Sequence, residues 1–376
     1  DHRDLHSFPT RRSSDLALCP RLGLEPSEAE TVAWLVRYHL LQSDTAFRRD
    51  LADPKTIEDF VQTVQSPERL RLLHILTVVD IRAVGPGTWT DWKRLLLTNI
   101  FEQAEERLRL GHKQHGRAEQ VAYRQSQFGE KLGWQSSVLK AHYRRLADSY
   151  WLAEPLDWQL SNALQIAKAE AEIGQVKPSF LIANDEASGA SRLSIFTADR
   201  PGLFARIAIG LANAGAMIIE ARIYTTRDGM ALDNLLVQDG QGLAYNDKRK
   251  ASRLLAALAN ALAQEQLPPI PVLGSLDARA SAFHISPSVL ISGKASIRTT
   301  VVEVNARDRM GLLARLCAAI YSEELVVHSA HIATYGERAV DVFYLTDANG
   351  KKLSDLKATA IRLALLAAVQ DQVVDS

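Results

Sequence analysis

Two similar segments of the chain combine residue types that could bind a free amino acid. They run Asp199-Arg200-Pro201-Gly202-Leu203 and Asp308-Arg309-Met310-Gly311-Leu312. In each segment the glycine allows a backbone conformation or a close approach that a Cβ atom would block. The amides beyond it open a helix and can receive a carboxylate, and the aspartate can receive an ammonium group. The candidate ligand-binding residues are therefore Asp199, Gly202, Leu203, Asp308, Gly311 and Leu312.

A purely structural interpretation is also open, in which the aspartate and the glycine only cap a helix and turn the chain. The two segments lie 109 residues apart, and the similarity extends well beyond them. It pairs Leu193 with Val302 and, after a one-residue deletion, Asp233 with Asp341. Self-similarity over this length indicates a duplicated domain. Retention of the turn in both copies favours a functional role, although duplication also copies structural caps.

The elements that must position these segments follow from the apolar pattern. Each copy begins with alternate apolar residues, which is typical of a half-buried strand, and continues with a helix after the glycine turn. Two further strands and a second amphipathic helix complete the order βαββα, with a closing strand for the first copy near Ser288–Ile291. This pattern predicts an α+β fold, in which two ferredoxin-like antiparallel sheets each carry both helices on one face.

A strand followed by Asp-Arg-Pro-Gly-Leu within a βαββα unit resembles the ACT domain, a small-molecule sensor that often binds amino acids. The resemblance covers residues from about 190 to 376 and implies that two such domains pair side by side, with ligands at the interface near the glycine loop. Met310 replaces the usual proline of the turn in the second copy, so that loop is less preorganised.

The first half of the chain places two polar residues on apolar helical faces. A capping box that starts at Ser27 begins a helix, and His39 lies on its apolar face. A second helix starts at about Pro67 and carries Asp80 on a face lined by leucines. On its own, His39 is best interpreted as a hydrogen-bonded histidine of the core. Asp80 requires a cation, either a metal ion or one of two nearby arginines. The arginines are Arg37 and Arg82.

These helices add a second resemblance. The sequences that carry it are Tyr38-His39-Leu40-Leu41-Gln42-Ser43, Arg48-Arg49-Asp50-Leu51-Ala52-Asp53-Pro54, Leu76-Thr77-Val78-Val79-Asp80-Ile81-Arg82-Ala83 and Trp89-Thr90-Asp91-Trp92-Lys93. They resemble the later part of the HD phosphohydrolase domain in the bifunctional PII uridylyltransferase/uridylyl-removing enzymes, a family that also ends in two ACT domains. The resemblance implies catalytic roles for His39 and Asp80, with Asp80 as a ligand of Mg²⁺ or Mn²⁺. It also implies the PII signal protein and glutamine as partners.

The chain departs from that family in ways that bear on activity. An HD site takes its metal from an early histidine, an adjacent His-Asp pair and a late aspartate, and only the last is identifiable, as Asp80. A nucleotidyltransferase motif is absent as well. We therefore expect a truncated C-terminal part, inactive alone, that binds divalent metal weakly or not at all. The alternatives are a non-catalytic amino-acid-binding ACT module and, less well supported, an HD-plus-ACT alarmone hydrolase.

Composition excludes several classes of protein. The 376 residues contain 44 basic and 44 acidic side chains, so electrostatics favour neither nucleic acid nor an anionic membrane as a partner. Two cysteines and no long apolar run predict a cytoplasmic protein without a membrane span. The interleaved basic and aromatic residues of 91–185 suit a helical connector better than an RNA-binding surface. The expected organisation is a disordered or non-native lead-in (1–16), a partial HD-like helical domain (17–110), a helical connector (111–190) and two ACT domains (191–292 and 298–376).

Overall fold

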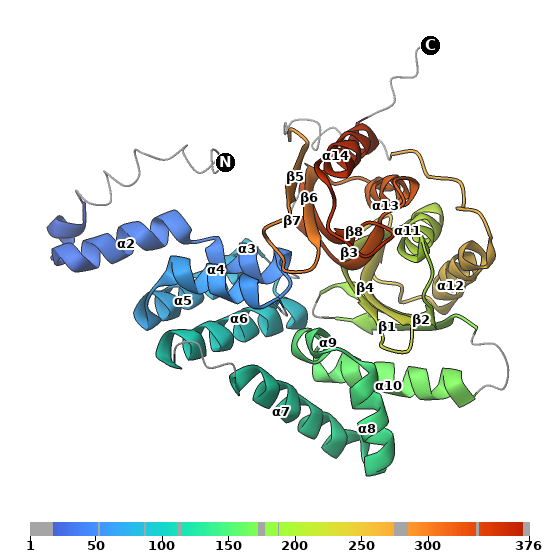
Figure 1. Ribbon diagram of the computed structural model, residues 1–376, viewed down its shortest axis with the longest axis horizontal. Coiled ribbons are helices and arrows are strands. Elements are labelled where there is room, and N and C mark those ends of the chain that lie inside the picture. Colours follow the sequence, from blue (N-terminus) through green and yellow to red (C-terminus); the bar gives the residue numbers. More distant parts are fainter. Residues whose placement is uncertain are drawn as a thin grey trace.

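A computed structural model describes residues 18–51, 53–85, 88–110, 115–171, 177–186, 188–273, 285–335 and 338–370 (Figure 1). The expected lead-in, residues 1–16, lies outside this part of the chain. A helical region comes first and two repeats of mixed structure follow, as the sequence predicted. None of the described helices is long and apolar enough to cross a membrane.

The helical region is built from short amphipathic helices. It comprises a 3₁₀ turn, η2 (Cys19–Leu22), and the helices α2 (Pro26–Tyr38), α3 (Leu41–Arg48), α4 (Pro54–Val64), α5 (Pro67–Val84), α6 (Asp91–Leu110), α7 (His115–Leu132), α8 (Ser136–Arg145), α9 (Asp148–Ala153) and α10 (Leu156–Ala171). Helices α4 and α5 start where a capping side chain precedes a proline. The caps are Asp53 and Ser66.

The predicted start of α2 needs a correction. The capping box is formed by Glu25 and Glu28, and its N-cap lies two residues before the expected start at Ser27. The side chain of Glu28 accepts a hydrogen bond from the Glu25 amide at 2.8 Å. The helix ends at Tyr38, so His39 lies at its C-terminal cap and not within the helix.

The two repeats share one antiparallel sheet of eight strands, in the order β1-β2-β4-β3-β7-β8-β6-β5. Copy one contains β1 (Ser179–Asp185), β2 (Ala190–Ala198), α11 (Leu203–Asn213), β3 (Ala216–Thr225), β4 (Met230–Asp239) and α12 (Lys248–Ala263). Copy two contains β5 (Ser288–Ser292), β6 (Thr300–Arg307), α13 (Leu312–Ser322), β7 (Val326–Tyr335), β8 (Arg338–Thr346) and α14 (Asp355–Val369). The copies meet where β3 pairs with β7, and α11 packs against α13.

Two edge strands differ from the expected organisation. The strand near Ser288–Ile291 pairs with β6 and so belongs to copy two, not to the end of copy one. Its counterpart β1 pairs with β2 and occupies a segment expected to be helical. Each copy is therefore ββαββα. The edge strand precedes its unit because an antiparallel partner needs only a short connection to the strand that follows it.

Both faces of the sheet are covered. Leu193 and Ile195 of β2 belong to the core shared with α11 to α14. Phe196, whose side chain points to the opposite face of the sheet, belongs to the core of the helical region. Alternate residues of a strand point to opposite faces. Helix α10 contacts β1 and β2, and α3 contacts β7, so the helical region packs on the face that the repeat helices leave open (Figure 1).

Candidate functional site

The glycine turn has the same geometry in both copies. Gly202 and Gly311 have φ angles of 73° and 85°, in the left-handed region where a Cβ atom is unfavourable, and each is the N-cap residue of the helix that follows. The N-cap residue of each helix is thus a glycine, which has no side chain to cap it. Asp199 accepts a hydrogen bond from the Thr225 hydroxyl at 3.0 Å.

The surroundings of the turn differ between the copies. In copy one, the aromatic ring of Tyr321, from α13, lies against Gly202, and a Cβ atom on that glycine would be 2.6 Å from it. The guanidinium of Arg206 lies 6.0 Å from the centre of the same ring. Tyr321 thus fills the space beside the copy-one loop.

Ala212 and Tyr321 occupy equivalent positions of the repeat, because they too are 109 residues apart. The copy-two loop therefore has Ala212 beside it where the copy-one loop has Tyr321. A small cavity of about 30 Å³ remains here, lined by Ala208 and Ala212 of α11, by the start of β3 and by the loop of residues 308–314. On its outer side Gly311 is covered by Pro271 and Val272, in the segment that follows α12. The copy-two loop is therefore covered by a connecting segment and not by a helix side chain.

A buried carboxyl group accompanies each loop. Asp341 of β8 lines the copy-two cavity together with Asp308, is 2% exposed, and has one carboxyl oxygen without a hydrogen-bond partner among the described residues. Burial raises the pKa of Asp341 well above its usual value, and the nearby Asp308 carboxylate raises it further. Burial and Asp199 raise the pKa of Asp233 in the same way. Only the alignment of Asp233 with Asp341 hinted at this pair in the sequence.

The groups around the copy-two cavity have charges that complement a small zwitterion. Two carboxyl groups that face one cavity are costly unless a proton or a cation lies between them, and an ammonium group would supply the cation. The N-terminal turn of α13 begins on the other side of Gly311, and its amides, with Leu312 as the first helical residue, favour a carboxylate. These are the two charged groups that every free α-amino acid carries.

The predicted catalytic residues of the helical region do not lie together in a buried site. Asp80 is exposed, and so is His39, whose Nδ1 lies 2.9 Å from the Val36 carbonyl oxygen. The buried residues of helix α5 are Leu70, Leu73 and Thr77, so the face that carries Asp80 is not the buried one. The expectation that Asp80 faces the helical core is therefore wrong. The helix has apolar residues on several faces, so its period could not identify the buried one.

The described residues do not offer a metal site. No group of three or more His, Cys, Asp or Glu side chains among them is arranged to hold an ion. An exposed carboxylate alone binds a divalent ion weakly. Among the described residues, Asp80 is the only one that matches a metal ligand of the family by motif. A single carboxylate does not make a site that fits Mg²⁺ or Mn²⁺.

We expect titration with Mn²⁺ to give equal and weak heats for the chain and for its Asp80→Ala variant. The measurement is isothermal calorimetry at neutral pH, with a matched Asp59→Ala variant, which removes an exposed aspartate of α4, as the control. Stoichiometric uptake that is lost only in Asp80→Ala would contradict the prediction, because it would require further ligands that converge on this carboxylate.

The aromatic residues of 91–185 are largely structural. Phe128 and Trp151 are fully buried and pack edge to face at 5.1 Å. Glu154, also fully buried, accepts hydrogen bonds from Trp92 Nε1 at 2.8 Å and from the hydroxyl of Tyr224, on β3, at 2.7 Å. Burial raises the pKa of Glu154. This glutamate thus connects the helical region to the sheet of copy one.

Comparisons with known proteins agree with this architecture. A family model described as the ACR family N-terminal ACT domain matches residues 295–365. Bifunctional uridylyltransferase/uridylyl-removing enzymes from Novosphingobium aromaticivorans, Erythrobacter litoralis and Zymomonas mobilis are 51%, 50% and 45% identical to the chain. The alignments cover 96%, 94% and 94% of this chain.

The chain spans only 39% of the length of each of these relatives. A solved structure of aspartate kinase from Synechocystis aligns with 51% of this chain and 29% of its own, at 20% identity and a TM-score of 0.25, which is too low to bear on function. Over almost its whole length, the chain is thus homologous to the C-terminal part of the bifunctional uridylyltransferase/uridylyl-removing enzymes.

Proposed function

We propose that the chain is the amino-acid-sensing part of an enzyme that uridylylates and deuridylylates the PII signal protein. Its ligand is a free amino acid, glutamine by family resemblance, and its binding site is the copy-two loop, from Asp308 to Leu312. The observation that carries this proposal is the difference between the loops. In copy one the side chain of Tyr321 fills the space beside the loop. In copy two Ala212 stands at the equivalent position, and a small cavity remains that is bordered by the carboxyl groups of Asp308 and Asp341.

Entry of glutamine requires a local movement. A cavity of about 30 Å³ holds little more than one water molecule. Pro271 and Val272 lie over Gly311, with the Val272 carbonyl oxygen 3.2 Å from the position of a Cβ atom. Displacement of this segment would open the loop without disturbing a strand or a helix of the sheet. In the bound state, Asp308 and Asp341 receive the ammonium group, and the first turn of α13 receives the carboxylate.

The hydrolytic activity of the family remains a proposal for a longer protein. Removal of the uridylyl group from PII is a phosphodiester hydrolysis, for which the family uses Mg²⁺ or Mn²⁺. By family resemblance Asp80 and His39 would take part in that chemistry, and the described residues hold no cluster of metal ligands around them. We therefore propose the alternative, a non-catalytic amino-acid-binding module, as the role of this chain when isolated.

Glutamine is expected to raise the melting temperature of the chain, and Ala212→Tyr is expected to abolish the effect. A ligand at 100 times its Kd stabilises the folded state by about 2.7 kcal/mol, which corresponds to several degrees for a domain of this size. The tyrosine reproduces at copy two the side chain that fills copy one. Differential scanning fluorimetry with up to millimolar glutamine, and with glutaramate, which is glutamine without its ammonium group, measures both effects.

The matched control is Tyr321→Ala, which empties the space beside Gly202 and leaves copy two unchanged. This variant is expected to retain the glutamine response. The absence of a shift in the unmodified chain would overturn the proposal, as would a response of equal size in Ala212→Tyr. An equal shift with glutaramate would show that the paired carboxyl groups do not bind the ammonium group.

A further inference from the structure

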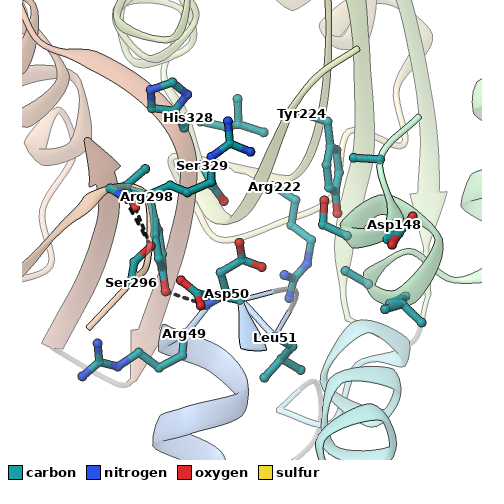
Figure 2. A pocket seen from close by; sticks show the side chains of 18 of the residues that line it. Arg49, Asp50, Leu51, Asp148, Arg222, Tyr224, Ser296, Arg298, His328 and Ser329 are labelled. Carbon is teal, nitrogen blue, oxygen red and sulfur yellow. Dashed lines mark hydrogen bonds between the residues drawn. The ribbon is translucent and has the colours of Figure 1, made fainter. Parts of the chain in front are cut away.

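A second and much larger cavity lies on the opposite face of the sheet, between the helical region and the junction of the two copies (Figure 2). Its volume is about 590 Å³, within the range of cavities that hold small organic ligands. The walls include residues 49–51, 53, 54, 146–149, 152 and 153 of the helical region, 222–225 and 227 of copy one, and 296–299, 328, 329 and 331 of copy two. Neither the predicted sensor loops nor Asp80 borders it.

Cationic side chains border this cavity from both repeats. Figure 2 shows Arg222 reaching in from β3 and Arg298 from the opposite wall. Arg222 is 8% exposed, and its Nε has no hydrogen-bond partner among the described residues. Arg298 is exposed and forms no ion pair within the described part of the chain. Arg49 and Arg227 also line the cavity.

Arg222 already interacts with the buried carboxyl groups of Glu154 and Glu220, whereas the lining carboxylates leave Arg298 without an ion pair among the described residues. The carboxylate of Asp53 already accepts hydrogen bonds from the backbone amides of Lys55 at 3.0 Å and Ile297 at 2.7 Å. Asp50 and Asp148 are the other carboxylates in the lining, and each has its own interactions. Burial lowers the pKa of His328 and His331, so these histidines add no charge at neutral pH.

Arginine is suited to one kind of anion in particular. Its planar fork of N–H donors matches the oxygens of a phosphate group, and an incompletely paired guanidinium in a partly enclosed space strengthens that interaction. Apolar and aromatic groups form other parts of the wall, including Leu51, Leu96 and Tyr224. These groups can pack against an uncharged portion of a ligand, such as a base and a sugar.

We infer that this cavity binds a phosphate monoester of about the size of a nucleotide, with Arg298 and Arg222 as the phosphate ligands and the leucine and tyrosine side chains around the remainder. Such a ligand contacts the helical region and both repeats at once. Its binding therefore stabilises the packing of the helical region against the sheet. The inference does not depend on the glutamine site, which lies on the other face of the sheet.

The test is calorimetric titration of the full chain with adenosine 5′-monophosphate and uridine 5′-monophosphate, with the corresponding nucleosides as ligands that lack the phosphate. We expect the monophosphates to bind and the nucleosides to bind at least about tenfold more weakly. Arg298→Ala should weaken monophosphate binding at least about tenfold, since it removes a charge-assisted contact. Because Arg298 is exposed, the variant should fold normally, and Arg298→Lys should restore part of the affinity.

Arg253→Ala is the matched control, because Arg253 is an exposed arginine on α12, on the other side of the sheet. This variant should bind the monophosphates like the unmodified chain. Ala212→Tyr and Asp80→Ala should also bind normally, which separates this cavity from the sensor loop and from the hydrolase region. Absence of heat with millimolar monophosphate would refute the inference, and so would equal losses in Arg298→Ala and Arg253→Ala.

Discussion

Replacement of Gly202 with alanine is expected to lower the free energy of unfolding by about 2 to 5 kcal/mol. Two costs combine. A residue with a Cβ atom at this left-handed φ loses about 1 to 2 kcal/mol, and a Cβ atom placed 2.6 Å from the Tyr321 ring adds an overpacking cost of about 1 to 3 kcal/mol. The contact with Tyr321 shows why the fold, and not only the loop, should respond to a substitution here.

The two costs can be separated with other residues of the chain. Gly229 has a φ of 77° and open space around it, so Gly229→Ala should show the backbone cost alone. In a Tyr321→Ala background, Gly202→Ala should likewise fall to about 1 to 2 kcal/mol, because the clash is gone. Urea denaturation of the four variants measures these differences. Equal losses in Gly202→Ala and Gly229→Ala would disprove the packing role assigned to Tyr321.

Glu154→Ala is expected to destabilise the chain by about 3 kcal/mol or more. The substitution removes a fully buried carboxyl group and leaves the Trp92 indole N–H and the Tyr224 hydroxyl without their acceptor, and each unsatisfied buried group costs about 1 to 3 kcal/mol. Glu154→Gln should cost less, because its amide oxygen still accepts one of the two hydrogen bonds.

Chemical denaturation followed by tryptophan fluorescence reports both variants, since Trp92 is buried at this contact. Glu170→Ala is a suitable control, because that glutamate is exposed and pairs with Arg145 outside this contact. A loss in Glu154→Ala no larger than that in Glu170→Ala would contradict the assigned role.

The local elements and the repeat could be predicted from the sequence because their causes are local. Alternation in β2, the helical period after each glycine, and the proline at the start of α5 act within a few residues. The left-handed conformation at Gly202 and Gly311 followed from the same kind of signal. The family of the chain also followed from short motifs, since these persist between relatives.

Other features depend on contacts between distant residues and could not be predicted. The partner of β5 is decided by the exposed edge of β6, not by the residues of β5. Helix α5 carries apolar residues on both its buried and its exposed faces, so only its packing shows that Asp80 points outward. The difference between the loops rests on Tyr321 and Ala212, which lie outside the repeated motif and meet it only in the folded chain.

The covalent joining of the two copies has a consequence for stoichiometry. In a symmetric homodimer, both interface loops are built from the same residues, so a side chain that closes one closes the other. Fusion in one chain removes that constraint, and Tyr321 and Ala212 differ at equivalent positions. We therefore expect the proposed sensor to bind one ligand per chain and to respond with a simple hyperbola. The graded response to ligand concentration would then be set by a single affinity, without cooperativity between the halves.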